Sequence, residues 1–287
     1  MKNISVIVPC YNEKVSVLAN TLSRLQSTFS KLKTLKYEIV VVNDGSKYDY
    51  SSLASKRIRI INHRKNRGYG ASLKTGISNS SYSWIGITDA DGTYPVEEFP
   101  KLIRYVNSYD VVIGKRNRKG IPLIRRFPKA VLRSFASFLA NKPIPDLNSG
   151  MRIFKKEIAM KFWHLYPEGF SFTSTLTMGC LTNNIDVKFT PINYFKRKGK
   201  SHIKPIKDTI RFFSLVLRLT VYFSPLRFFV PMGLTFGILA ILRGIRDIYI
   251  QNHFGGLCLV LFFLSIQTFF FGLIADLIIK NNKMKKD

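Results

Sequence analysis

The stretch Trp84-Ile85-Gly86-Ile87-Thr88-Asp89-Ala90-Asp91-Gly92 decides the fold. Its first five residues form a short apolar run, which predicts a buried strand, and Asp89 and Asp91 follow that run directly. Mg²⁺ and Mn²⁺ prefer hard oxygen ligands, and a partial carboxylate shell leaves positions for diphosphate oxygens. An Asp-x-Asp triplet alone is a weak signal. At a strand end it predicts a site for a divalent cation.

Four further runs rich in Val and Ile predict strands at Ile4–Val8, Glu38–Asn43, Ile58–Asn62 and Asp110–Ile113. Helical spacing occurs between the strands, at Val15–Leu35, Ala71–Asn79 and Val96–Val106. This alternation predicts an α/β fold, Rossmann-like, with a mostly parallel sheet and helices on both faces. Ligands of such sheets bind beyond the carboxyl ends of the strands.

The residues that leave the first two predicted strands are polar or aromatic. The first strand ends in Pro9-Cys10-Tyr11-Asn12-Glu13, without the glycine fingerprint that a dinucleotide fold has at this turn. The second ends at Asp44, which can accept hydrogen bonds from a base or a ribose, although an Asp in a turn is common. Gly68-Tyr69-Gly70 comes later, and Leu73 stands where a third glycine would fall, so we exclude an NAD site.

Charge and cysteine content limit the function classes further. The 287 residues have a net charge of +28, which implies an anionic partner such as a membrane surface, a phosphorylated substrate or nucleic acid. The stretch 115–145 is rich in Lys and Arg and contains no acid. Three widely separated cysteines argue against a disulfide framework or a zinc site and favour a reducing compartment.

The last third of the chain has the composition of a membrane anchor. Lys204, Lys207, Arg211 and Arg218 share one face of a predicted helix, as in a basic amphipathic helix at a membrane interface. Gly255–Ile279 is long enough to span a bilayer, and Phe228–Leu242 is slightly short, so together they predict a transmembrane hairpin. A buried pair of helices in a soluble protein is the alternative.

The predicted hairpin turns around Arg246–His253, and its second helix is followed by a lysine-rich tail. By the positive-inside rule this tail lies in the cytoplasm, and two crossings place the N-terminal domain on the same side. We therefore predict a catalytic domain over 1–204, an interface helix over 205–225 and a hairpin over 226–287. The expected location is the cell membrane, multi-pass, with the catalytic domain on the cytoplasmic face.

Four motifs, in this order and spacing, resemble those of the GT-A-fold family 2 glycosyltransferases. They are Pro9-Cys10-Tyr11-Asn12-Glu13, Val42-Asn43-Asp44-Gly45-Ser46, Asn66-Arg67-Gly68-Tyr69-Gly70-Ala71 and Asp89-Ala90-Asp91-Gly92. Three more resemble the polyprenyl-phosphate hexose synthases, the dolichyl-phosphate mannose and glucose synthase group. They are Gly114-Lys115-Arg116, Asp146-Leu147-Asn148-Ser149-Gly150-Met151-Arg152 and Arg197-Lys198-Gly199-Lys200-Ser201. The likeness covers residues 3–204, and the two crossings match the membrane-anchored branch.

The resemblance implies an inverting hexosyltransferase that takes sugar from a UDP- or GDP-linked donor, holds Mg²⁺ or Mn²⁺, and makes a lipid-phosphate-linked sugar for cell envelope glycans. The implied nucleotide-sugar contacts are Pro9, Tyr11, Glu13, Asp44, Asp89 and Ala90. The implied metal ligands are Asp89 and Asp91. The implied acceptor-phosphate contacts are Arg116, Arg125, Arg126, Lys200 and Ser201, and the residues given a catalytic role are Asp91, Arg116 and Lys200.

The chain departs from the family pattern at three places. Asn43 replaces a commoner Asp, Thr93 replaces a Gln of some members, and Phe170–Thr175 lacks an acid that many relatives have. The last change leaves donor specificity open. A lipid monophosphate is largely dianionic at neutral pH, so a single displacement with no general base and no essential histidine is expected. Among the four histidines, His202 is the one we expect to be closest to a phosphate.

Several other functions are compatible with parts of the sequence. Nucleic-acid binding would suit the charge, but no recognised motif supports it, and we expect no nucleic acid partner. A processive polysaccharide synthase would have a Q-x-x-R-W motif and more crossings. A family 2 enzyme that acts on a hydroxyl of a glycolipid, lipopolysaccharide or capsule precursor would need a base, for which Asp146 is the candidate. A degenerate membrane scaffold conflicts with the intact Asp89–Asp91 pair. A homo-oligomer and a partner flippase stay open.

Overall fold

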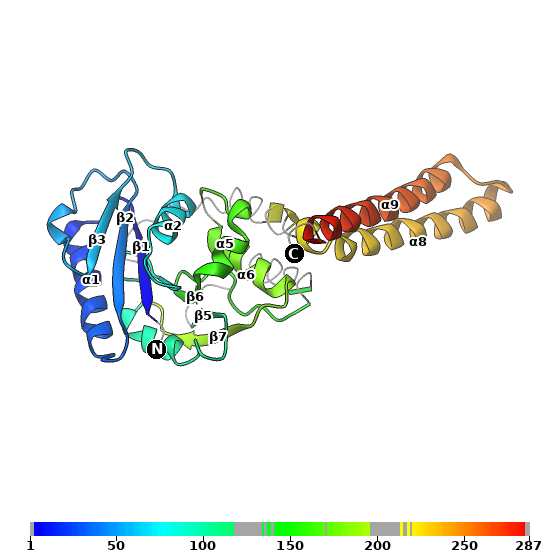
Figure 1. Ribbon diagram of the computed structural model, residues 1–287. Coiled ribbons are helices and arrows are strands. Elements are labelled where there is room, and N and C mark those ends of the chain that lie inside the picture. Colours follow the sequence, from blue (N-terminus) through cyan, green and yellow to red (C-terminus); the bar gives the residue numbers. More distant parts are fainter. Residues whose placement is uncertain are drawn as a thin grey trace.

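The computed structural model describes residues 3–117, 134, 137–138, 141–169, 171–195, 213–214, 217–218 and 220–284. These residues form an α/β domain and a long helical hairpin that projects from it (Figure 1). Most of the predicted interface helix over 205–225, and the predicted boundary at 204, lie outside the described residues. The division into three parts therefore stays a prediction.

Seven strands form one sheet within the described residues, in the order β3-β2-β1-β4-β6-β5-β7. Their bounds are β1 Ile4–Cys10, β2 Tyr37–Asn43, β3 Ile58–Asn62, β4 Trp84–Ile87, β5 Val111–Arg116, β6 Arg152–Lys155 and β7 Val187–Ile192. All five predicted strands are present, and the mostly parallel sheet is confirmed. Strands β6 and β7 were not predicted: β6 lies between β4 and β5 and is antiparallel to both, and β7 pairs in parallel with β5.

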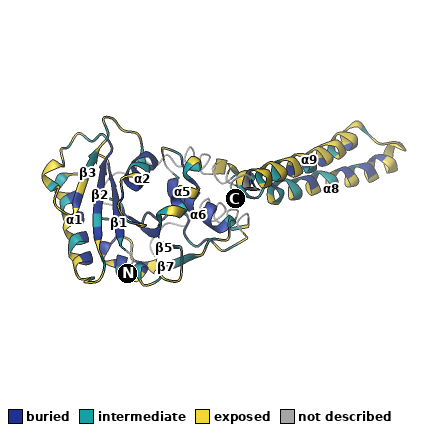
Figure 2. Ribbon diagram, in the orientation of Figure 1, coloured by how far each residue is buried: buried dark blue, intermediate teal, exposed yellow. Residues whose placement is uncertain are grey.

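Helices cover both faces of the sheet, as predicted (Figure 1). One face packs against α1 (Val15–Ser30) and α3 (Phe99–Ile103), and the other against α2 (Tyr69–Ser78), α5 (Lys156–Lys161) and α6 (Phe172–Thr182). Short 3-10 turns, η1 Ser51–Leu53, η2 Val96–Glu98 and η3 Trp163–Leu165, connect these elements. Figure 2 shows the buried strands enclosed between the two layers.

Two predicted helices are shorter than their apolar spacing indicated. Helix α1 ends at Ser30, five residues before Leu35, because Leu32 and Leu35 donate their amides to carbonyls three residues earlier in successive turns. A continuous helix from Val96 would need an amide donor at Pro100, which proline lacks. The chain instead forms η2 and then the five-residue α3.

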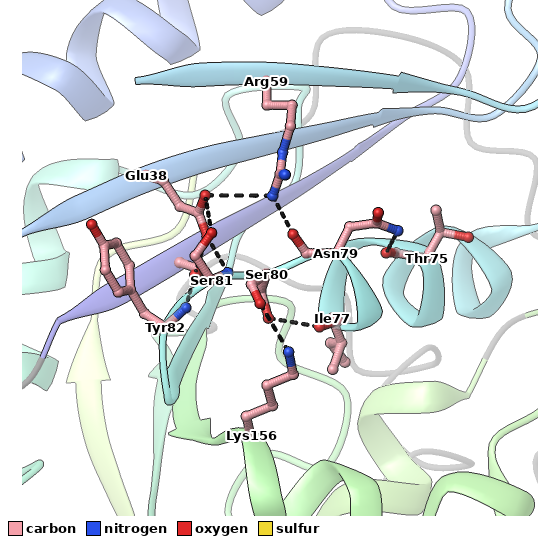
Figure 3. Close-up of polar contacts among 10 residues, drawn as sticks. Glu38, Arg59, Thr75, Ile77, Asn79, Ser80, Ser81, Tyr82 and Lys156 are labelled. Carbon is pink, nitrogen blue, oxygen red and sulfur yellow. Dashed lines mark hydrogen bonds and ion pairs between the residues drawn. The ribbon is translucent and has the colours of Figure 1, made fainter. Parts of the chain in front are cut away.

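A polar network joins the amino ends of the strands (Figure 3). Glu38, at the start of β2, accepts hydrogen bonds from Ser5 Oγ at 2.6 Å and from the Ser81 amide at 2.6 Å. Arg59 Nη2 lies 3.4 Å from the same carboxylate, and Lys156 Nζ donates to the Ser80 carbonyl at 2.9 Å. These side chains tie the loop before β4 to the sheet. This edge is bridged by the protein's own contacts, so a ligand site is expected at the opposite edge.

The hairpin consists of α8 (Leu226–Gln251) and α9 (Gly256–Met284). A helix of 26 residues is about 39 Å long at 1.5 Å per residue, enough for a hydrocarbon core of about 30 Å. Only 17% and 22% of the apolar windows of the two helices are buried inside the protein, and Figure 2 shows their outer faces exposed. This exposure does not fit the alternative of a buried pair of helices in a soluble protein.

Small residues allow the two hairpin helices to pack closely. A Cβ added at Gly233 would lie 3.0 Å from the Phe269 ring, and one added at Gly244 would lie 3.1 Å from Cys258 Sγ. Ser265 Oγ donates to the Gly233 carbonyl at 2.8 Å. Small side chains and a hydroxyl that bonds across the helices are typical of helix pairs in membranes.

The predicted polar turn at Arg246–His253 is wrong in position. Helix α8 continues to Gln251, and the chain reverses over residues 252–255. Asp247 explains the longer helix, because it is buried, pairs with Arg243 Nε at 2.9 Å and accepts the Gly255 amide at 3.2 Å. The polar residues near the tip are therefore accommodated within the helix.

Candidate active site

Three predicted site segments meet at one edge of the sheet. Strand β1 pairs in parallel with β2 and with β4, so the residues that follow these strands leave the sheet side by side. The Asp44 amide donates to the Cys10 carbonyl at 2.8 Å, which joins the first two exits directly. Pro9 is buried at this edge, Tyr11 is exposed, and the Glu13 carbonyl accepts the Tyr50 hydroxyl at 2.6 Å. The exposed Tyr11 ring and the polar groups beside it can bind a nucleoside, whose base is planar.

Asp44 is buried and organises the loop that follows β3. Its Oδ1 accepts the Arg67 amide at 2.9 Å and lies 2.7 Å from His63 Nδ1, while Oδ2 accepts the Gly68 amide at 2.7 Å. His63 Nε2 lies 2.9 Å from Thr75 Oγ1, so the histidine bridges two elements. These bonds use three of the roughly four acceptor positions of a carboxylate. Predicted as a nucleoside contact, Asp44 also has a structural role that the sequence did not reveal.

The glycines at Gly68 and Gly70 allow two backbones to approach closely. The Gly70 amide donates to the Gly169 carbonyl at 2.9 Å, and the Ala71 amide donates to the Glu168 carbonyl at 2.8 Å. A Cβ added at Gly70 would lie 2.0 Å from the Pro167 carbonyl oxygen. Protein carbonyls thus occupy these amides at the start of α2.

Asp89 and Asp91 leave the end of β4 and are both partly exposed. The Tyr69 hydroxyl donates to Asp89 Oδ1 at 3.2 Å, and Thr93 donates to Asp91 Oδ1 from its amide at 3.0 Å and from its hydroxyl at 2.7 Å. The intervening Ala90 is buried, and its carbonyl accepts the Thr21 hydroxyl at 3.1 Å. Thr93, which the sequence analysis noted as a departure from the family pattern, thus orients Asp91, whereas the contact of Tyr69 with Asp89 was not predicted.

The carboxylate oxygens of Asp89 and Asp91 fit a hard divalent cation whose remaining coordination positions are filled by a bound ligand or water. No cluster of three or more His, Cys, Asp or Glu side chains suited to a metal occurs among the described residues. The edge would therefore supply the two carboxylates of Asp89 and Asp91, and the diphosphate of a donor or water would complete the shell. Mg²⁺ is commonly bound in this way, through one or two carboxylates and substrate phosphates.

Arg116, at the end of β5, forms a two-point ion pair with Asp146. Its Nε and Nη2 donate to the two carboxylate oxygens, each at 2.8 Å, and its amide donates at 3.2 Å. Burial alone lowers the pKa of Arg116, but the bonds to Asp146 raise the pKa overall, so the guanidinium stays charged. Arg116 was predicted to bind the acceptor phosphate; part of its hydrogen-bonding capacity is taken by Asp146.

Tyr94 connects the Asp89 region to the Arg116 region. It accepts the Gly150 amide at 2.7 Å, and a Cβ added at Gly150 would lie 2.9 Å from Asp89 Oδ2. The Tyr94 ring lies 5.0 Å from the Tyr194 ring, over which the Arg116 guanidinium sits at 5.4 Å. Burial raises the pKa of Tyr94, so its hydroxyl stays protonated. The predicted metal ligand and the predicted phosphate ligand thus border one shared region.

Arg152 is fully buried and holds the turn that contains Gly150. Its Nε donates to the Ser149 carbonyl at 3.1 Å, and its Nη1 donates to the Thr173 carbonyl at 2.8 Å and to the Thr177 hydroxyl at 3.1 Å. Burial lowers the pKa of this arginine. Arg152 ends the Asp146–Arg152 motif, but no sequence pattern indicated that its guanidinium is buried.

The remaining predicted site residues lie outside the described residues. They are Arg125, Arg126, Lys200 and Ser201, and His202 lies outside them as well. Their roles in binding the acceptor phosphate stay predictions.

Comparison with protein families gives two matches. The model for glycosyl transferase family 2 matches residues 5–163, and the model for the GtrB C-terminal hairpin matches residues 224–280. The first match includes the three strand exits and Arg116. The second match coincides with α8 and most of α9 and supports membrane anchoring by the hairpin.

Similar curated proteins include hexosyltransferases of two domains of life. The dolichyl-phosphate hexose transferase of Haloferax volcanii is 25% identical, over 71% of this chain and 87% of its own length. The human dolichyl-phosphate beta-glucosyltransferase is 28% identical, over 69% of each chain. The low-salt glycan biosynthesis hexosyltransferase Agl6 of H. volcanii is 26% identical over 71% of this chain, which spans about half (51%) of Agl6.

Among solved structures, glucosyl-3-phosphoglycerate synthase of Mycobacterium tuberculosis, in complex with Mn²⁺, UDP and phosphoglyceric acid, superposes with a TM-score of 0.59. The identity is 16%, and the match covers 76% of this chain and 78% of that one, so it shows the GT-A fold alone. The family model covers more than half of this chain. The chain therefore belongs to glycosyl transferase family 2 and is a glycosyltransferase with a GtrB-type hairpin at its C-terminal end.

Proposed function

We propose that the protein transfers a hexose from a nucleotide-sugar to a polyprenyl or dolichyl phosphate at the membrane surface. The observation on which this rests is the presence of a family 2 catalytic domain and a two-helix membrane anchor in one chain. An acceptor confined to the bilayer suits an enzyme that is itself held at the bilayer. Two of the relatives described above are named for transfer to dolichyl phosphate.

The donor would bind at the carboxyl edge of the sheet. The nucleoside would lie among the predicted contacts Pro9, Tyr11, Glu13 and Asp44, where an exposed ring and a buried carboxylate are present. Asp89 and Asp91 would hold Mg²⁺ or Mn²⁺, whose chemistry is to neutralise the diphosphate as it departs. Tyr69 and Thr93 keep the two carboxylates in place before the donor arrives.

The acceptor would need little activation. The second pKa of a phosphate monoester is about 6, so the lipid phosphate is largely dianionic at neutral pH and is already a nucleophile. The protein has to neutralise and orient the lipid phosphate, and Arg116, at the end of β5, can do this. We propose that Arg125, Arg126, Lys200 and Ser201 complete this phosphate site. A single displacement would then invert the anomeric carbon.

The alternative acceptor, a hydroxyl of a glycolipid, lipopolysaccharide or capsule precursor, is less compatible with the site. It would require a general base, and Asp146 was the candidate. The Asp146 side chain is 1% exposed and forms a two-point ion pair with Arg116. A buried carboxylate held by a guanidinium is a weak base, because the neighbouring positive charge stabilises its ionised form.

We further propose a multi-pass topology with the catalytic domain in the cytoplasm. Helix α9 runs back toward the domain, so two crossings leave both ends of the hairpin on one side (Figure 1). Lys280 and the lysines that follow it fit the positive-inside rule on that side. A product made there and used across the membrane would require a flippase. A homo-oligomer stays open.

The decisive assay uses membranes that contain the full-length protein, a panel of labelled nucleotide-sugars and polyprenyl phosphate, with and without a chelator. We expect one donor to give a labelled lipid, and Asp91→Ala to abolish transfer while the protein still inserts. Asp186→Ala is the matched control, because Asp186 is exposed and precedes β7 at the amino edge. Failure to label the lipid with any donor would overturn the proposal.

A second assay tests the acceptor site. Arg126→Ala should raise the KM for lipid phosphate more than the KM for the nucleotide-sugar. The reverse order would assign the basic segment to the donor.

A further inference from the structure

The entry of the chain into the hairpin is fixed against the catalytic domain. The Phe223 ring lies 5.7 Å from the Phe162 ring in an edge-to-face contact. Tyr222 contacts η3 at the same place, with its hydroxyl 2.7 Å from His164 Nε2. Helix α8 begins at Leu226, just after this segment. The surface of α5 and η3 is therefore adjacent to the root of the membrane anchor.

Chain geometry limits how far this surface can lie from the bilayer. The four steps from Tyr222 to Leu226 span about 6 Å if helical and at most about 14 Å if fully extended. The headgroup layer is about 5–8 Å thick on each side of the hydrocarbon core. If α8 enters the core near Leu226, then Tyr222 and its partner His164 lie at or close to the level of the lipid headgroups.

The chemistry of this surface suits that level. Met160 is 46% exposed and Tyr222 is 41% exposed, and Lys161 is exposed beside Met160 at the end of α5. Lys74 Nζ lies 6.0 Å above the partly buried Trp163 ring. Tryptophan and tyrosine rings with lysines around them are typical of the membrane interface, where the rings enter the headgroup layer and the ammonium groups meet anionic lipid.

We propose that this surface, here called the α5–η3 seat (Met160, Lys161, Trp163, His164 and Tyr222), rests on the headgroups of an anionic bilayer. The inference rests on the proposed insertion of the hairpin into lipid. The seat would be a second contact, on the catalytic domain itself, that fixes the tilt of the domain over the membrane. A lipid surface is the partner because the seat is continuous with the anchor through Tyr222.

The tryptophan content of the chain provides the test. It has two tryptophans, Trp84 in buried β4 and Trp163 in the seat. Full-length Trp84→Phe and Trp163→Phe variants each retain one emitter and would be reconstituted in phosphatidylcholine–phosphatidylglycerol vesicles. We expect a spin label on the lipid headgroup to quench Trp163 and to leave Trp84 unchanged. Equal quenching of the two residues would overturn the proposal.

A third variant separates failure of the seat from failure of the anchor. Tyr222→Trp, with phenylalanine at both natural tryptophan positions, reports the level of the hairpin root, and flotation with vesicles reports insertion. Quenching at the hairpin root without quenching of Trp163 would refute the seat and leave the proposed function intact. Absence of flotation would refute insertion and the seat together.

Charge reversal tests the preference for anionic lipid. Lys161→Glu, made in the chain whose single emitter is Trp163, should reduce headgroup quenching in anionic vesicles and change it little in pure phosphatidylcholine. Lys33→Glu is the matched control, because Lys33 is an exposed lysine in the turn after α1. Equal effects of the two variants would mean that Lys161 does not contact the lipid.

Discussion

Replacing Asp146 by asparagine tests the electrostatics of the site directly. Asp146 is 1% exposed and Arg116 is 18% exposed, and three hydrogen bonds join them. Removal of one partner from a buried ion pair costs about 3–5 kcal/mol, because the other charge stays buried without compensation. For a domain of this size, 1 kcal/mol corresponds to about 2–4 °C in Tm. We therefore expect Asp146→Asn to lower the Tm by about 6–20 °C.

Thermal unfolding of the detergent-solubilised protein, followed by tryptophan fluorescence, measures this change. Asp186→Asn is the control and should leave the Tm unchanged, because that carboxylate is exposed. Arg116→Met combined with Asp146→Leu should recover most of the lost stability, since apolar residues often replace a buried pair without cost. The double variant should still lack transfer to lipid phosphate, because the guanidinium is absent.

One result would refute this reasoning. If Asp146→Asn kept the Tm of the unmodified protein and lost all transfer, the carboxylate would act in the chemical step and not in the ion pair. Asp146 would then be the general base, and the acceptor would be a hydroxyl. The stability measurement thus discriminates between the two acceptor classes without knowledge of the sugar.

Three further predictions concern other parts of the molecule. Tyr69→Phe removes the donor to Asp89 and should lower kcat/KM by about 10- to 150-fold, since a hydrogen bond to a charged group contributes about 1.5–3 kcal/mol. Steady-state kinetics at several Mn²⁺ concentrations measure the change, and an unchanged rate would contradict it. Gly70→Ala should lower the free energy of unfolding by about 1–3 kcal/mol, because the new Cβ would collide with the 167–169 backbone, and equal denaturation curves would disprove this. Burial raises the pKa of Cys180 above its ordinary value of 9.0, so the thiol stays protonated at pH 8 and the native protein should resist maleimide labelling at this position; mass spectrometry detects the label, and rapid modification would contradict the burial.

The sheet could be predicted where strands are continuous apolar runs, and not where polar residues interrupt or begin them. Strands β1, β2, β4 and β5 follow from such runs, since nearly all their residues are buried, and β3 follows from its Ile content although it is only partly buried. Strand β6 has four residues and begins with Arg152, which a pattern search treats as a surface residue. Its place between β4 and β5 depends on pairing with segments about 40 and 70 residues away. The local sequence therefore does not indicate that β6 is a strand of this sheet.

The site shows the same limit. Parallel topology alone predicts that Asp44 and the Asp89–Asp91 pair lie at one edge of the sheet. The partners that orient them are distant in the sequence: His63, just after β3, bonds Asp44, and Tyr69, at the start of α2, bonds Asp89. These contacts depend on how helix α2 and the loop before it pack against the sheet. Composition and spacing do not indicate that packing. The roles of the site residues themselves stay predictions that the proposed assays test.

The close packing of α8 and α9 has a consequence for the lipid. At the levels of Gly233 and Gly244 the two helices are in close contact, so an isoprenoid tail cannot pass between them at these two points. On the proposed function, the tails of substrate and product would lie in the surrounding bilayer at these two levels and not between α8 and α9. Any selectivity among lipid acceptors would then depend on their phosphate head groups.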